Sequence, residues 1–192
     1  MKNIKEIMKE CLTSEAESLR YLSESIEQNS VSFCEVISKC SGKVIFTGVG
    51  KSLIVASKIA GTLSSIGIAS TAISPLSLLH GDLGFITSYD LVIALSNSGE
   101  TDILIDALDC IKSKGAKILS ITGNARSTIA GLSSETVEIP SEEVGPFGLV
   151  PTTSTTLMMA FGDAVACALV EIMNIDINDF YANHPFGSLS KK

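Results

Sequence analysis

The sequence predicts an α/β protein, a three-layer αβα sandwich on a five-stranded parallel sheet with helices at the N-terminus. Five short β-rich runs alternate with helical stretches, and glycines stand at several of the boundaries between them. Strands that alternate with helices form right-handed β-α-β units and hence a parallel sheet. Hydrophobic residues make up 45% of the 192 residues, which is enough to bury the core of one domain.

The first forty residues are expected to be helical and to precede the sheet. Apolar side chains recur there every three or four positions, as in Ile4, Met8, Leu12, Leu19 and Leu22. This spacing places them on one face of a helix.

After Gly42 the pattern alternates between strands and helices. The predicted strands are residues 43–47, 69–73, 91–95, 117–122 and 136–139. Helices are predicted over 51–66, 101–114 and 153–173, and Gly115 stands where a glycine commonly ends a helix. The tail after Asn174 is expected to form a short helix and a His-Pro turn. We therefore expect one domain over 1–192, with a helical segment at 1–41, an α/β core at 42–174 and a tail at 175–192.

The composition argues against nucleic-acid and membrane partners. Fourteen Lys and Arg against 21 Asp and Glu leave a net charge of −7, aromatic residues are 5%, and Trp is absent. Nucleic-acid binding proteins usually carry basic patches and stacking aromatics. The most apolar stretch, residues 157–170, is too short for a bilayer and contains Asp163, and the first twenty residues do not resemble a signal peptide.

The cysteines predict a reduced, cytoplasmic protein. They are odd in number and scattered, without a Cys-x-x-Cys pair: Cys11, Cys34, Cys40, Cys110 and Cys167. Since no His/Cys/Asp cluster has ligand spacing, no metal cofactor is expected.

Three segments rich in glycine and hydroxyl side chains follow predicted strands or precede the last long helix. They are residues 48–52, 96–101 and 152–156. Open parallel sheets bind ligands at the carboxyl ends of their strands, where helix N-termini offer backbone N–H groups. The pattern predicts a site for a small phosphorylated ligand, and helix capping is the alternative for each cluster. The candidate binding residues are Gly50, Ser52, Ser96, Asn97, Ser98, Glu100, Thr101, Thr153, Ser154 and Thr155.

Neither common nucleotide-binding motif is present. A Walker A loop ending at Gly50 needs a glycine where Ile45 stands, and a dinucleotide fingerprint from Gly48 needs one at Leu53. No nucleotide cofactor is expected.

The remaining candidates are two histidines and a carboxylate pair. His80 and His184 both lie in turn-like segments, where catalytic groups concentrate but where structural histidines are also common. Glu142 and Glu143 open a Gly/Pro loop after the fifth predicted strand. A role as a base requires one of them to lie in the crevice with a pKa raised by burial; otherwise the pair is solvated charge.

Taken together, five motifs resemble the SIS (sugar isomerase) domain family. They are Gly-Val-Gly-Lys-Ser at 48–52, His-Gly-Asp-Leu-Gly at 80–84, Ser-Asn-Ser-Gly-Glu at 96–100, Pro-Thr-Thr-Ser-Thr-Thr at 151–156 and Asn-His-Pro at 183–185. The resemblance runs from about residue 43 to 189 and points to the D-arabinose 5-phosphate isomerases of the Kdo pathway. It implies a flavodoxin-like sheet, catalytic roles for Lys51, Glu143 and His184, and a substrate-site role for His80.

The sequence also departs from that family's pattern. Ile103 stands where many members have a second glutamate, which leaves Glu100 and Asp102 as substitutes, and Ser74 replaces a histidine associated with zinc inhibition. Longer members continue into paired CBS domains, so the chain is similar to the short form without them.

The resemblance implies an aldose–ketose isomerase that interconverts D-ribulose 5-phosphate and D-arabinose 5-phosphate through an enediol, without a cofactor. Its product would serve lipopolysaccharide or capsule synthesis. It also implies a homotetramer with active sites shared between subunits. Two alternatives are an isomerase of a hexulose or heptulose phosphate and a sugar-phosphate sensor without catalysis.

Overall fold

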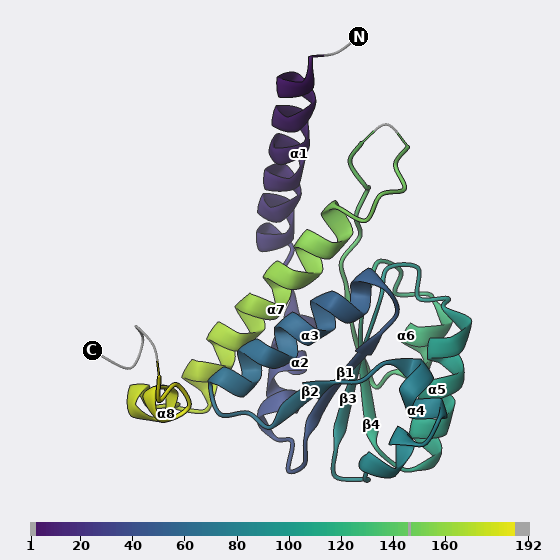
Figure 1. Ribbon diagram of the computed structural model, residues 1–192, viewed down its shortest axis with the longest axis vertical. Coiled ribbons are helices and arrows are strands. Elements are labelled where there is room, and N and C mark those ends of the chain that lie inside the picture. Colours follow the sequence, from purple (N-terminus) through teal and green to yellow (C-terminus); the bar gives the residue numbers. More distant parts are fainter. Residues whose placement is uncertain (1–2, 146, 187–192) are drawn as a thin grey trace.

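The computed structural model describes residues 3–145 and 147–186 and contains a parallel sheet between two layers of helices (Figure 1). The strand order is β2-β1-β3-β4-β5, and every neighbouring pair is parallel. The three-layer sandwich with a five-stranded sheet is confirmed. The strands are β1 (Val44–Gly48), β2 (Ser70–Ala72), β3 (Leu91–Ser96), β4 (Lys117–Thr122) and β5 (Glu135–Glu138).

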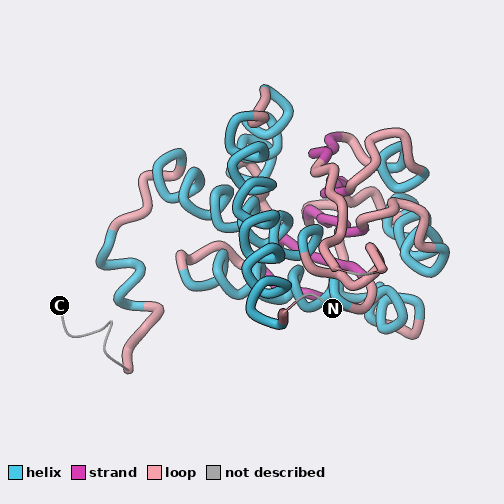
Figure 2. Tube along the Cα trace, turned by 90° about the horizontal axis from the view of Figure 1, so that it is seen from above, coloured by secondary structure: helices cyan, strands magenta, loops and turns pink. Residues whose placement is uncertain are grey.

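The helices cover both faces of the sheet, as Figure 2 also shows. Helices α2, α3 and α7 pack on one face, and α4, α5 and α6 on the other. In β1 the side chains alternate accordingly, because Val44 and Phe46 join the first core and Ile45 the second. The helices are α1 (Ile4–Glu24), α2 (Gln28–Ser38), α3 (Lys51–Ser65), α4 (Pro75–Leu79), the 3₁₀ helix η1 (Asp82–Phe85), α5 (Asp102–Ser113), α6 (Thr128–Leu132), α7 (Thr153–Ile172) and α8 (Ile177–Ala182).

The structure adds features that the sequence pattern does not predict. The N-terminal forty residues form two helices, separated at residues 25–27, and only α2 buries side chains in the core. Three short helices, α4, η1 and α6, also appear. Ser74 and Ser127 cap α4 and α6 through hydrogen bonds to backbone N–H groups, and both helices are too short for an apolar repeat to show.

Helix α7 is a core helix that crosses one face of the molecule. Its 20 residues are long and apolar enough to cross a membrane by length and composition only, a test that buried core helices also pass. Leu157, Phe161 and Leu169 are nevertheless buried against the first core. Gly162 lets α7 approach α3 closely, because a Cβ there would lie 2.4 Å from Ile59 Cγ1.

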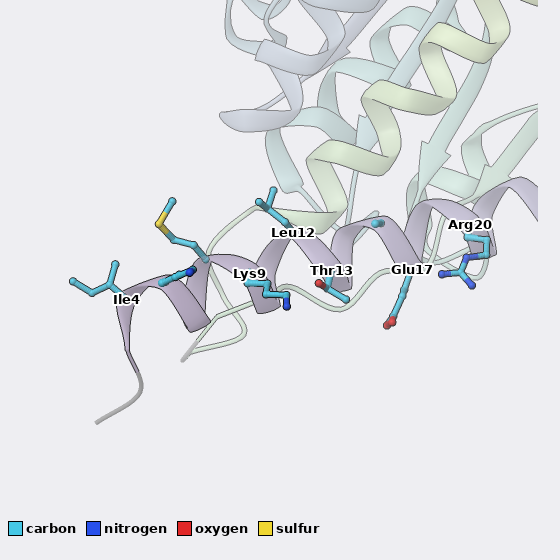
Figure 3. A pocket seen from close by; sticks show the side chains of 9 residues that line it. Ile4, Lys9, Leu12, Thr13, Glu17 and Arg20 are labelled. Carbon is cyan, nitrogen blue, oxygen red and sulfur yellow. The ribbon is translucent and has the colours of Figure 1, made fainter.

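Helix α1 extends away from the rest of the molecule (Figure 1). None of its described residues is buried, and the exposed fractions of Ile4, Met8 and Leu12 are 76%, 62% and 67%. These side chains line an open groove of about 700 Å³ along the helix, shown in Figure 3. A large exposed apolar face commonly marks an interaction surface.

Candidate active site

The candidate site lies where β1 and β3 end. These strands are neighbours, and their following helices, α3 and α5, pack on opposite faces of the sheet. This is the topological switch point of an open α/β sheet, where the connecting loops separate and leave a crevice. Two of the three predicted glycine- and hydroxyl-rich segments meet at this edge.

The first segment joins β1 to the start of α3. Gly50 has a φ of +59°, which favours glycine, and stands at the N-cap of α3. A Cβ on Gly48 would lie 2.9 Å from the Leu95 carbonyl oxygen, so glycine lets this loop lie against β3. Lys51 is exposed in the first turn and Ser52 is half-buried, which leaves the lysine ammonium accessible to an anion at this helix end.

The second segment, residues 97–101, is called the β3–α5 loop below. Ser96 is buried, and its Oγ accepts a hydrogen bond from the Gly99 N–H (3.1 Å) and lies 3.1 Å from Thr101 Oγ1. Asn97 and Ser98 are exposed. Ser96 and Thr101 therefore shape the loop, whereas Asn97 and Ser98 present polar groups to solvent.

The third segment is the N-terminus of α7, where Glu143 is bound. The Glu143 carboxylate accepts hydrogen bonds from the Thr152 N–H (2.8 Å), the Thr152 hydroxyl (3.1 Å) and the Ser154 N–H (3.3 Å). It also accepts a bond from the Ser154 hydroxyl. Thr152 thus holds Glu143, a role that its position just before a helix could have suggested.

These bonds correct the expectation about the pKa of Glu143. Burial alone raises the pKa of its carboxyl, but the hydrogen bonds from Ser154 and Thr152 together outweigh burial and lower it. Glu143 is therefore ionised at neutral pH. Among the described residues, the hydroxyl of Thr153 beside it is buried without a hydrogen-bond partner.

Thr155 and Glu100 have partners within the protein. The Thr155 hydroxyl donates to the Thr152 carbonyl (2.9 Å), a bond within the first turn of α7 that differs from the predicted cap, because a capping side chain accepts from a backbone N–H. The Glu100 carboxylate accepts a hydrogen bond from the Thr128 N–H (2.8 Å) at the start of α6. Half-buried Ile103 stands where the family glutamate is missing, with Glu100 and Asp102 as the two expected substitutes. Because Glu100 is bonded to Thr128, Asp102 remains, and it is exposed in the first turn of α5.

Within one chain, His184 lies far from both Lys51 and Glu143. His184 Nδ1 lies 2.8 Å from the Phe180 carbonyl oxygen, and its ring packs on Phe180 with centroids 4.2 Å apart. The neighbouring Asn183 contacts Ser65 at the C-terminal end of α3, whereas Lys51 begins that helix about 22 Å away. Helix α8 likewise lies beyond the end of α7 opposite to Glu143 (Figure 1).

His80 stands at the C-terminal end of α4, which follows β2. Its Nδ1 lies 2.9 Å from the Leu76 carbonyl oxygen, and its side chain is exposed. In the part of the chain that the structure describes, no three His, Cys, Asp or Glu side chains are grouped to hold a metal ion. Pro146 of the Gly/Pro loop and residues 187–192 of the predicted tail lie outside the described residues.

The loops after β1 and β3 therefore combine neutral donors and a lysine at one edge of the sheet, while the N-terminus of α7 holds an ionised carboxylate. Hydroxyl and backbone N–H groups suit a phosphate, and hydrogen bonds to a charged partner are stronger than neutral ones. The carboxylate can accept a proton, and the lysine can stabilise negative charge on an oxygen.

Comparison with known proteins shows which family the chain resembles. The SIS domain model matches residues 37–168. Arabinose 5-phosphate isomerase KpsF of Escherichia coli O6:H1 is 40% identical over 187 residues, which cover 96% of this chain and 57% of that protein. Arabinose 5-phosphate isomerase KdsD of Salmonella typhi is 38% identical, with 96% and 56% covered. This chain thus spans a little over half the length of these curated relatives.

A solved structure matches over its whole length. The Escherichia coli CFT073 protein c3406, in complex with arabinose 5-phosphate, has a TM-score of 0.92 and 36% sequence identity. The match covers 96% of this chain and 100% of that one. On the match to the family model and this agreement in fold and sequence, the chain belongs to the SIS domain family.

Proposed function

We propose that the chain is an aldose–ketose isomerase that interconverts D-ribulose 5-phosphate and D-arabinose 5-phosphate. The observation that carries this proposal is the match, at a TM-score of 0.92 and 36% identity, to a structure in complex with arabinose 5-phosphate. The hydroxyl-rich edge beside β1 and β3 supports it, because these loops offer neutral donors suited to a phosphate.

The reaction moves a proton between C1 and C2 of the sugar through an enediol. Glu143 is ionised at neutral pH and so can accept this proton, which it returns to the adjacent carbon. Its lowered pKa makes it a weaker base than a carboxylate whose pKa is raised by burial, so this role depends on its fixed position and on ionisation. Its hydrogen bonds from Thr152 and Ser154 hold the carboxylate in one orientation. Orientation reduces the entropic cost of the transfer.

Negative charge develops on the substrate oxygens as the proton leaves. The Lys51 ammonium would stabilise this charge, since a preorganised cation acts most strongly where charge forms in the transition state. Ser52, Asn97, Ser98 and the start of α7 would bind the phosphate and the sugar hydroxyls.

His184 completes the site from a second copy of the chain. Within one chain it lies beyond the far end of α7, which spans about 30 Å over its 20 residues. A second subunit could bring its own His184 to Lys51 and Glu143, where the imidazole would transfer the protons on O1 and O2. The exposed apolar face of α1 supports an assembly of subunits, and a tetramer of two dimers is the form we propose.

The test is a panel of pentose, hexose and heptose phosphates assayed without added cofactor. We expect turnover of D-arabinose 5-phosphate and D-ribulose 5-phosphate that survives dialysis against a chelator. Faster turnover of a hexulose or heptulose phosphate would show that the substrate is that sugar phosphate and not a pentose phosphate. Binding of a sugar phosphate without turnover would indicate a sensor. Activity that returns only with a divalent ion would contradict the cofactor-free mechanism.

A further inference from the structure

Glu100 makes a contact that substrate binding does not explain. Its carboxylate accepts a 2.8 Å hydrogen bond from the Thr128 N–H, 28 residues away in the sequence. Thr128 is the first residue of α6, and the N–H groups of a first helical turn have no partner within their helix. The Glu100 side chain therefore joins two segments that follow different strands.

Backbone hydrogen bonds near Glu100 join the same two segments. The Ile129 N–H donates to the Gly99 carbonyl (3.1 Å), and the Gly123 N–H donates to the Asn97 carbonyl (3.0 Å). Gly99 has a φ of +69°, and a Cβ there would lie only 2.0 Å from Ser127 Oγ. The β3–α5 loop thus rests directly on residues 123–129.

The position of this loop decides where its exposed donors point. Asn97 and Ser98 face solvent at the switch point, and the Ser98 hydroxyl accepts a hydrogen bond from the Glu100 N–H (3.2 Å). Hydrogen bonding by Thr128 lowers the pKa of the Glu100 carboxyl, so the acceptor is charged at neutral pH. Backbone groups make the other hydrogen bonds described above between the β3–α5 loop and residues 123–129, and Glu100 adds one from its side chain.

We infer that Glu100 is a positioning residue, whose carboxylate holds the β3–α5 loop against α6 so that Asn97 and Ser98 can bind phosphate. This inference rests on the proposed function, which assigns the binding of phosphate to Asn97 and Ser98. Without the carboxylate, the loop would spend less time in its binding form, and the apparent affinity would fall by the same fraction.

Three variants separate this role from direct action on the substrate. Glu100→Gln keeps an oxygen that can accept from Thr128, and Glu100→Ala removes it. Glu138→Ala is the matched control, because Glu138 is also exposed and accepts a 2.8 Å bond from the Ala125 N–H in the same segment, but it does so from β5 and not from the β3–α5 loop. The measurements are kcat and KM for the sugar phosphate and the dissociation constant of inorganic phosphate.

We expect Glu100→Ala to raise KM and the phosphate dissociation constant together by roughly 5- to 20-fold, with a smaller change in kcat. Glu100→Gln and Glu138→Ala should both stay within about twofold of the wild type. A loss of kcat in Glu100→Gln as large as in Glu100→Ala would overturn the inference. It would show that the negative charge of Glu100 acts directly on the substrate. Unchanged phosphate binding in Glu100→Ala, or an equal loss in Glu138→Ala, would overturn it as well.

The phosphate measurement also separates the two proposals. If the wild type binds phosphate but turns over no pentose phosphate, the proposed function fails, and the comparison of the three variants still decides the role of Glu100. If the wild type is active and Glu100→Ala binds phosphate normally, only the role of Glu100 fails. A wild type that binds neither phosphate nor sugar phosphate would overturn both.

Discussion

Ser98 and Thr155 carry the same hydroxyl chemistry in different surroundings. Ser98 is exposed on the β3–α5 loop, whereas the Thr155 hydroxyl donates to a backbone carbonyl in the first turn of α7. We expect Ser98→Ala to raise KM by roughly tenfold with little change in melting temperature, since the proposed bond to the phosphate would be lost. Thr155→Ala should lower stability by about 0.5–1.5 kcal/mol and leave KM almost unchanged. Steady-state kinetics with thermal unfolding test both, and a reversed pattern would exchange their roles.

Asp90 is a buried carboxylate at the opposite end of the sheet. Its oxygens accept bonds from the Lys43 ammonium (3.0 Å), the Lys43 N–H (2.7 Å) and the Thr87 N–H (2.7 Å). Burial raises the pKa of its carboxyl, but the hydrogen bonds from Lys43 and Thr87 outweigh burial and lower it. Asp90 therefore stabilises the fold while it is ionised.

We expect Asp90→Asn to lower the free energy of unfolding at pH 7 by about 2–4 kcal/mol. A carboxyl whose pKa is lowered in the folded state contributes fully above its unfolded pKa, here near 3.8, and loses that contribution as the pH falls below it. Urea unfolding at pH 7 and pH 3 should thus show a gap between wild type and variant that narrows in acid. A gap of equal size at both pH values would contradict a role for the charge.

At the scale of elements, the contact between α3 and α7 depends on a glycine. A Cβ on Gly162 would lie 2.4 Å from Ile59 Cγ1, so Gly162→Ala should destabilise by about 1–3 kcal/mol through overpacking. Gly61 on α3 is the matched control, because a Cβ there meets nothing within 4 Å. Gly61→Ala should stabilise the protein by about 0.5–1 kcal/mol. Thermal unfolding measures both, and equal shifts of the same sign would show that the close approach has no energetic effect.

The second prediction at this scale is that the exposed apolar face of α1 lies in an interface between subunits. A charge placed in a buried apolar contact is costly, so Leu12→Glu should shift the assembly towards smaller species. The subunit itself should stay folded, because Leu12 is 67% exposed within one chain. Leu12→Met, which conserves volume and apolarity, is the control. Light scattering after size-exclusion chromatography gives the mass, and an unchanged assembly in Leu12→Glu would exclude this face from the interface.

At the scale of the whole molecule, the separation of Glu143 and His184 makes a shared active site testable. Glu143→Gln and His184→Ala should each be nearly inactive, since each removes one of the two proposed proton-transfer groups. Mixed proteins should regain part of the activity after subunit exchange, because some sites then combine one intact residue from each chain. Failure to regain activity, once exchange into mixed oligomers has been demonstrated by mass, would contradict sharing.

By itself, the sequence determined the succession of strands and long helices along the chain, the parallel pairing of the strands and the positions of the three polar segments. These follow from local signals, since an apolar period, a glycine at a helix end and a cluster of hydroxyls can each be recognised within a few residues. The departures lie where local signals are weak, as in the five-residue helices α4 and α6 and the break between α1 and α2.

The tertiary structure alone decided the partners of the polar side chains. Glu143 meets the N-terminus of α7, so that the lowering of its pKa by hydrogen bonds exceeds the raising by burial. Glu100 meets a backbone N–H of α6, and His184 lies beyond the far end of α7. Such pairings depend on the positions of atoms that are distant in the chain, and residue type does not encode them locally. For that reason the sequence could name groups suited to the chemistry, and their catalytic roles stay predictions, but it could not show which partners each group meets in the folded chain.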